Sequence, residues 1–127
     1  CGLLPREEVR AQFASSHLHV LTSAYEANAT VMFEAMEECV PSIVFDHFGM
    51  ADLVKDGSTG RKIPVSDYET MCRSFAAALD EIAENPALLR SWALNMREDS
   101  KQYTAEKRAE FFEICYKTAI KNHGEKI

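Results

Sequence analysis

The chain has 127 residues, which is enough for one small domain with a real hydrophobic core. Its net charge of −6 and its pI of about 5.2 disfavour nucleic acid as a partner, because phosphates attract surfaces rich in lysine and arginine. The 4 cysteines show no Cys-x-x-Cys spacing, and no apolar run approaches the roughly 20 residues of a membrane span. These features predict a cytoplasmic protein with reduced thiols that associates with a membrane at most peripherally, at its inner face.

The first half of the chain is predicted to alternate helices and strands. A helix is expected at residues 5–16, starting at Pro5, followed by a strand at residues 18–22. A second strand is expected at residues 42–46, where a near-continuous apolar run is typical of a parallel strand buried on both faces.

A helix is predicted between these strands, with Asn28 as its N-cap and an apolar stripe at Val31, Met32, Ala35 and Met36. Glu26 precedes the helix, and Glu34 is expected about two turns inside it, so their carboxylates should lie on the order of 10–12 Å apart. The unpaired N–H groups and the positive dipole end between them suit a phosphate. On spacing alone, a solvated helix face remains the simpler interpretation of Glu34.

The rest of the chain is predicted to form a short helix at residues 49–55, a strand at residues 61–65 and then helices only. A capping box at Ser66 should open the first of these helices, Asn85 should end it, and Thr104 should cap the last helix. Two cysteines, Cys39 and Cys72, fall on apolar positions and are expected in the core.

Strands alternating with helices imply right-handed βαβ units and an α/β fold class. We expect a partial Rossmann-like three-layer α/β/α domain with a short parallel sheet over residues 1–103, and a C-terminal helix with a polar tail over residues 104–127. Three strands are few for so many helices, and the chain starts at Cys1. Both features indicate a fragment of a longer protein.

Several short motifs occur in a characteristic order. They are Ser23-x-x-Glu26, Glu34-Ala35-Met36, Pro41, Ile43-Val44-Phe45, Gly49, Asp52 and Asp56-Gly57-Ser58-Thr59-Gly60. Together they resemble the donor-binding half of retaining glycosyltransferases of the two-Rossmann-domain (GT-B) type, the group 1 family with a Glu-x7-Glu motif. The resemblance extends over about residues 2–105.

The resemblance implies transfer of a sugar from a nucleoside-diphosphate sugar to an acceptor, with retention at the anomeric carbon and without a metal or other cofactor. Glu26, as the catalytic-site residue, would meet the hydroxyls of the donor sugar, and Glu34 would meet the ribose hydroxyls. The other donor-binding residues carried over are Ala27, Asn28, Ala29 and Thr30 at the diphosphate, Gly49 and Asp52 at the sugar, and Leu3 and Leu4 at the base.

Ordinary structural roles remain open for the same residues: capping for Asn28 and Thr30, core packing for Leu3 and Leu4, a turn for Gly49, and a first-turn carboxylate for Asp52. The chain departs from the family pattern at Ala27, Cys39, Met50 and Asp52. Of these, Ala27 and Met50 are expected to limit the approach of the sugar to the backbone. A non-catalytic Rossmann-like binding or assembly module and a sugar-nucleotide epimerase-like domain are therefore the alternatives.

The partners that the resemblance implies are a sugar nucleotide and, through a missing N-terminal domain, a glycan or lipid-linked acceptor. The fragment alone is expected to be inactive and to self-associate through an exposed sheet edge. His17 and His19 have the period-two spacing of half a zinc site, but histidines at the surface or at a sheet edge are the simpler interpretation.

Overall fold

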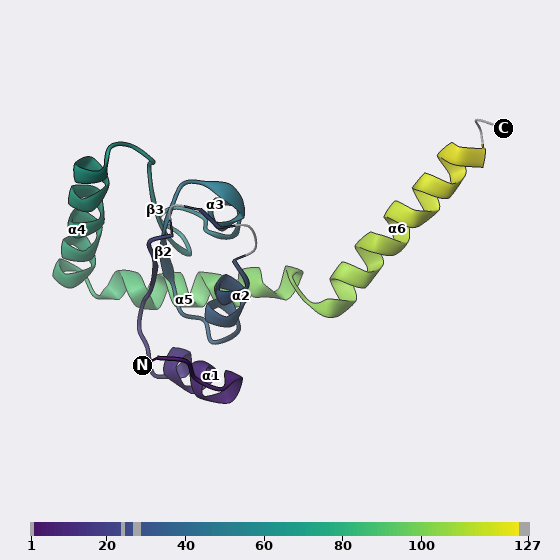
Figure 1. Ribbon diagram of the computed structural model, residues 1–127. Helices are drawn as coiled ribbons and strands as arrows, with labels where there is room; N and C mark the ends of the chain where they lie inside the picture. The colour runs from purple at the N-terminus through teal and green to yellow at the C-terminus, as the bar shows by residue number, and fades with distance from the viewer. Residues whose placement is uncertain (1, 24, 27–28, 125–127) are drawn as a thin grey trace.

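The computed structural model describes residues 2–23, 25–26 and 29–124 (Figure 1). In chain order, the elements are α1 (Arg6–Ala14), β1 (His19–Leu21), α2 (Thr30–Glu37), β2 (Ser42–Phe45), α3 (Phe48–Leu53), β3 (Gly60–Ile63), α4 (Tyr68–Glu84), α5 (Ala87–Asp99), a 3-10 turn (Ser100–Gln102) and α6 (Ala105–Gly124). The expected alternation of helices and strands is confirmed, with element ends shifted by at most two residues.

The sheet consists of three parallel strands in the order β1-β2-β3. Ser42 of β2 lies opposite His19 of β1 and opposite Gly60 of β3. The backbones approach closely at Gly60, where an added Cβ atom would lie 2.1 Å from the carbonyl oxygen of Ser42. A glycine at this position allows β3 to pair with β2 without a clash between a side chain and the β2 backbone.

All four residues of β2 are buried, and their side chains alternate between two apolar layers. Ile43 and Phe45 pack with residues of α4 and α5, among them Phe75 and Trp92. Val44 packs on the opposite face with residues of α2 and α3, including Met32, Met50 and Val54. The three-layer α/β/α class is therefore confirmed. Both crossover helices lie on one face because right-handed connections that advance in one direction along a sheet stay on one side.

The turn after α2 explains one departure from the family pattern. Cys39 has a φ of 56°, in the left-handed region that glycine adopts most easily. The N–H of Val40 donates to the carbonyl of Ala35 at 2.8 Å, and that of Cys39 donates to the carbonyl of Met36 at 3.0 Å. These two bonds form a Schellman motif, whose left-handed position is usually a glycine.

Helix α4 starts differently from the sequence prediction. Its N-cap is Asp67, whose carboxylate accepts a hydrogen bond from the N–H of Thr70 at 2.9 Å, so the expected cap at Ser66 is wrong. A carboxylate is favoured here because it also interacts with the positive end of the helix dipole. The buried stripe runs through Phe75, Ala78 and Ile82, which leaves Cys72 exposed rather than in the core.

Helices α5 and α6 begin as predicted. Asn85 ends α4, and Trp92 and Met96 of α5 are buried. The N–H of Lys107 bonds to the hydroxyl of Thr104 at 3.3 Å, which confirms this cap. Figure 1 shows α6 projecting away from the other elements, and all its described residues are exposed. Within the described ranges, no helix combines the length and apolarity needed to cross a bilayer.

The edge strand β1 carries a half-buried histidine. His19 Nδ1 lies 3.1 Å from the hydroxyl oxygen of Ser42, and its ring packs edge-on against Phe13 with centroids 5.4 Å apart. Burial lowers the pKa of His19 because a charged imidazolium would lose hydration. His17 is exposed, so the two histidines have different surroundings.

We expect the free energy of unfolding to fall as the pH drops below about 6.5, the ordinary pKa of a histidine side chain. The folded-state pKa of His19 is lower than that value, so the unfolded chain takes up the proton first and is stabilised. Urea unfolding of the wild type, His19→Gln and the control His17→Gln at pH 7.5 and pH 5.5 measures this. A His19→Gln protein with an unchanged pH dependence would contradict it.

Candidate functional site

Two loops meet at the carboxyl edge of the sheet, where parallel α/β domains bind ligands. One loop joins β1 to α2 and carries Glu26, and the other joins β2 to α3 and leads into Gly49. Because β1 and β2 are neighbours, these loops are adjacent. The structure thus brings two of the predicted site regions to one edge.

The start of α2 differs from the prediction. The N-cap is Ala29 rather than Asn28, and no side chain at this cap bonds to the helix. Ala29 is buried with Met32 and Val44, which anchors the turn in the core one residue later than expected. Ala27 and Asn28 lie outside the described residues. The N–H of Met32 donates to the carbonyl of Ala29 at 2.9 Å, and no cap side chain bonds to the N–H groups of the first turn, among them that of exposed Thr30.

Glu26 and Glu34 lie on either side of this helix start, and both are half-buried. Glu34 is the fifth residue of α2, so it lies about 6 Å along the axis from Thr30, little more than one turn. Counted from the N-cap, Glu34 lies about 7.5 Å along the axis instead of the roughly 9 Å that a cap at Asn28 implies, because the helix begins one residue later than predicted.

Glu34 lines a cleft of about 130 Å³ between α1 and α2, together with Arg6, Glu7, Arg10 and Glu37. Arg10 joins the two helices through an ion pair with Glu38, with Nε and Oε1 2.5 Å apart. Arg6 lies one turn before Arg10, and Glu34 lies one turn before Glu38. Both Arg6 and Glu34 line this cleft. These cations were not predicted from the sequence, although the four-residue spacing of the two arginines places them on one helix face.

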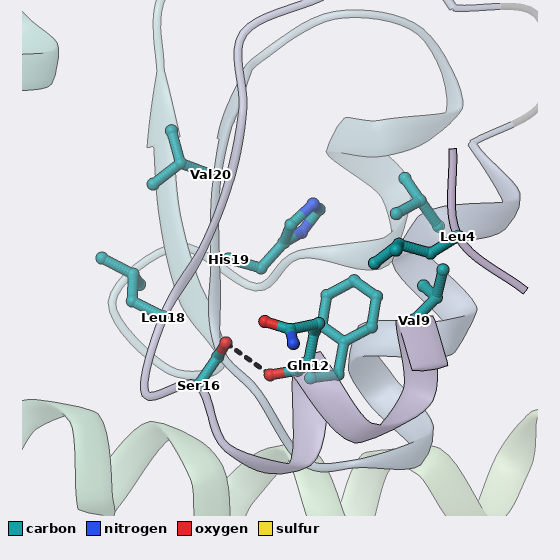
Figure 2. A pocket seen from close by; sticks show the side chains of 9 residues that line it. Leu4, Val9, Gln12, Ser16, Leu18, His19 and Val20 are labelled. Carbon is teal, nitrogen blue, oxygen red and sulfur yellow. Dashed lines mark hydrogen bonds between the residues drawn. The ribbon is translucent and has the colours of Figure 1, made fainter. Parts of the chain in front are cut away.

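A larger apolar pocket of about 370 Å³ lies beside β1 (Figure 2). Its walls include Leu4, Val9 and Phe13, the ring of His19, and Val31 from the first turn of α2. Leu4 therefore lies near the start of α2. Leu3 is fully exposed, so the alternative of a core role for Leu3 is wrong.

The start of α3 requires two further corrections. Asp52 is exposed at the fifth position of the helix rather than in its first turn, and Gly49 is exposed at the second. Met50 is fully buried against α2 and β2, so its side chain belongs to the core. The unusual residue is Phe48, whose φ of 52° is strained for a bulky side chain, at a cost of about 1–3 kcal/mol. No sequence signal pointed to it.

A short parallel sheet with helices on both faces is of the Rossmann-like α/β class. The chain belongs to the family described as Glycosyl transferases group 1, whose family profile matches residues 1–106. The resemblance seen in the sequence is thereby confirmed at the level of the family.

Two curated relatives are similar to most of this chain. An exopolysaccharide phosphotransferase from Streptomyces coelicolor is 30% identical over 104 residues, covering 80% of this chain and 11% of that protein. An amylovoran biosynthesis glycosyltransferase from Erwinia amylovora is 28% identical over 103 residues, covering 80% of this chain and 28% of that protein. The chain thus spans less than a third of either relative.

A solved structure has the same fold. Sucrose-phosphate synthase from Thermosynechococcus elongatus superposes with a TM-score of 0.79 at 24% identity. The match covers 96% of this chain and 30% of that structure. At this identity the likeness establishes the fold alone.

Proposed function

We propose that this chain forms the donor-binding part of a retaining glycosyltransferase that uses a nucleoside-diphosphate sugar. The observation that carries the proposal is that Glu26 precedes α2 in a loop at the carboxyl edge of the sheet, while Glu34, the fifth residue of α2, lines a cleft with Arg6 and Arg10. Membership of the group 1 family supports it.

Each group has a role in this proposal. Glu26 accepts hydrogen bonds from hydroxyls of the donor sugar, and Glu34 accepts them from the ribose diol. Backbone N–H groups of Ala29 and Thr30, with Ala27 and Asn28, hold the diphosphate and stabilise the charge that develops on it as the sugar leaves. Leu4 and its pocket border the base, while Gly49 and Asp52 lie toward the sugar.

These residues bind, orient and stabilise charge without a step that needs a metal ion or other cofactor. Because the chain spans less than a third of its curated relatives, we place the binding of a glycan or lipid-linked acceptor outside it. The cytoplasmic location, at most peripheral to a membrane, remains part of the same proposal.

The nucleotide side of the proposal is tested by Glu34→Gln. A charge-assisted hydrogen bond contributes about 1.5–3 kcal/mol, so the affinity for nucleoside diphosphates and their sugar conjugates should fall roughly 10- to 100-fold. Calorimetric titration of the full-length protein with UDP, GDP, UDP-glucose and GDP-mannose measures this loss. The exposed Glu84→Gln on α4 serves as the control.

Two results would count against the proposal in different ways. Equal affinities of the wild type and Glu34→Gln would remove Glu34 from the ribose. Failure of the wild type to bind any nucleotide or sugar nucleotide in the panel would favour the non-catalytic module.

A further inference from the structure

Aromatic rings from the loop after β1 and from the start of α3 meet at the carboxyl edge of the sheet. Tyr25 follows β1, and His47 and Phe48 follow β2. The Tyr25 and Phe48 rings pack edge to face, with centroids 4.9 Å apart and planes at 75°. The His47 ring lies against Phe48 with centroids 3.8 Å apart. The contact between Tyr25 and Phe48 links the loop after β1 to α3.

This aromatic cluster is open to solvent. Tyr25 is 73% exposed and Phe48 is 39% exposed, and neither belongs to the two apolar clusters that hold the helices on the sheet. Rings of this size are normally buried where they serve the core. Their exposure at a ligand-binding edge therefore indicates a surface for contact with another molecule.

The backbone of Phe48 gives independent support. Its positive φ is a conformation in which glycine or asparagine is relaxed and a bulky residue is strained. Strained residues of this kind cluster at functional sites, where the strain orients a side chain. Here it orients the Phe48 ring toward the loop that carries Tyr25 and Glu26.

We propose that Tyr25 and Phe48 form a platform for the C–H face of the donor's pyranose ring. This inference rests on the proposed function. An aromatic ring offers a flat apolar surface with a negative face, which suits the weakly positive C–H groups of a sugar. Tyr25 directly precedes Glu26 and Phe48 directly precedes Gly49, the two residues proposed to lie at the sugar. The aromatic rings then stack on the same pyranose ring whose hydroxyls bond to Glu26.

The platform predicts a selective loss at the sugar end of the donor. In the full-length protein, Phe48→Leu and Tyr25→Leu should each lower the preference for a sugar nucleotide over its bare nucleoside diphosphate by about fivefold. Affinity for the bare nucleotide should not change. The preference is the ratio of the affinity for a sugar nucleotide to that for its bare nucleoside diphosphate. Calorimetry with UDP-glucose and UDP, and with GDP-mannose and GDP, measures this ratio for the pair that the protein binds.

The controls separate stacking from folding. Phe48→Tyr keeps a ring and should keep the preference, and Tyr68→Leu removes an aromatic side chain that is 80% exposed on α4 and should have no effect. The exposure of Tyr25 makes Tyr25→Leu the variant least able to disturb the fold, and a thermal melt of each protein checks this.

The possible outcomes distinguish the two proposals. An unchanged ratio, or an equal loss of sugar nucleotide and bare nucleotide, would overturn the platform and leave the proposed function standing. A wild-type protein that binds no nucleotide would overturn the proposed function and the platform together.

Discussion

Gly60→Ala is expected to destabilise the domain severely, lowering the melting temperature by on the order of 10 °C. The new Cβ atom would lie 2.1 Å from the carbonyl oxygen of Ser42, and this neighbour is backbone in a central strand. Relief requires β2 and β3 to separate. Overpacking of this kind costs about 3 kcal/mol, a large part of the stability of a small domain.

Gly49→Ala is the matched control for this prediction. Its added Cβ atom would meet no heavy atom within 4 Å, and its backbone is helical, so the stability should stay the same or rise slightly. Thermal melts of both variants followed by circular dichroism measure the difference. A Gly60→Ala protein that melts with the wild type would show that the strands are farther apart than described.

Glu26→Gln is expected to lower kcat/KM for sugar transfer about 100-fold or more in the full-length enzyme. The substitution keeps the shape of the side chain but removes the charge, so its hydrogen bonds to sugar hydroxyls weaken. Because Glu26 is proposed to contact the sugar only, affinity for the bare nucleoside diphosphate should remain that of the wild type. This pattern is the opposite of the uniform loss expected for Glu34→Gln.

Transfer assays with a radiolabelled sugar nucleotide, together with nucleotide titrations, separate these two patterns, and Glu84→Gln is again the control. Wild-type turnover by Glu26→Gln would remove this residue from the sugar site. A parallel loss of nucleotide affinity would instead indicate that the half-buried Glu26 acts by holding the loop before α2.

The family-related features of the chain were predictable because they depend on local order along the sequence. The apolar run of β2 and the helical stripe of α2 predicted the α/β layers, and the ordered series of short motifs from Ser23 to Gly60 indicated the group 1 family. Caps were less predictable because neighbouring polar residues compete for the same N–H groups. At α4, Asp67 rather than Ser66 fills this role.

Periodicity and motif spacing are local properties, so the order of residues alone was enough to specify the α/β class, the succession of strands and the carboxyl-edge position of the loop containing Glu26. Packing between elements was needed to place Arg6 across from Glu34, to bury Met50 and to bring Tyr25 against Phe48. These contacts join residues on different elements, so they depend on how helices and loops pack against the sheet. The strained φ of Phe48 likewise follows from the path of the loop and not from the preference of the residue.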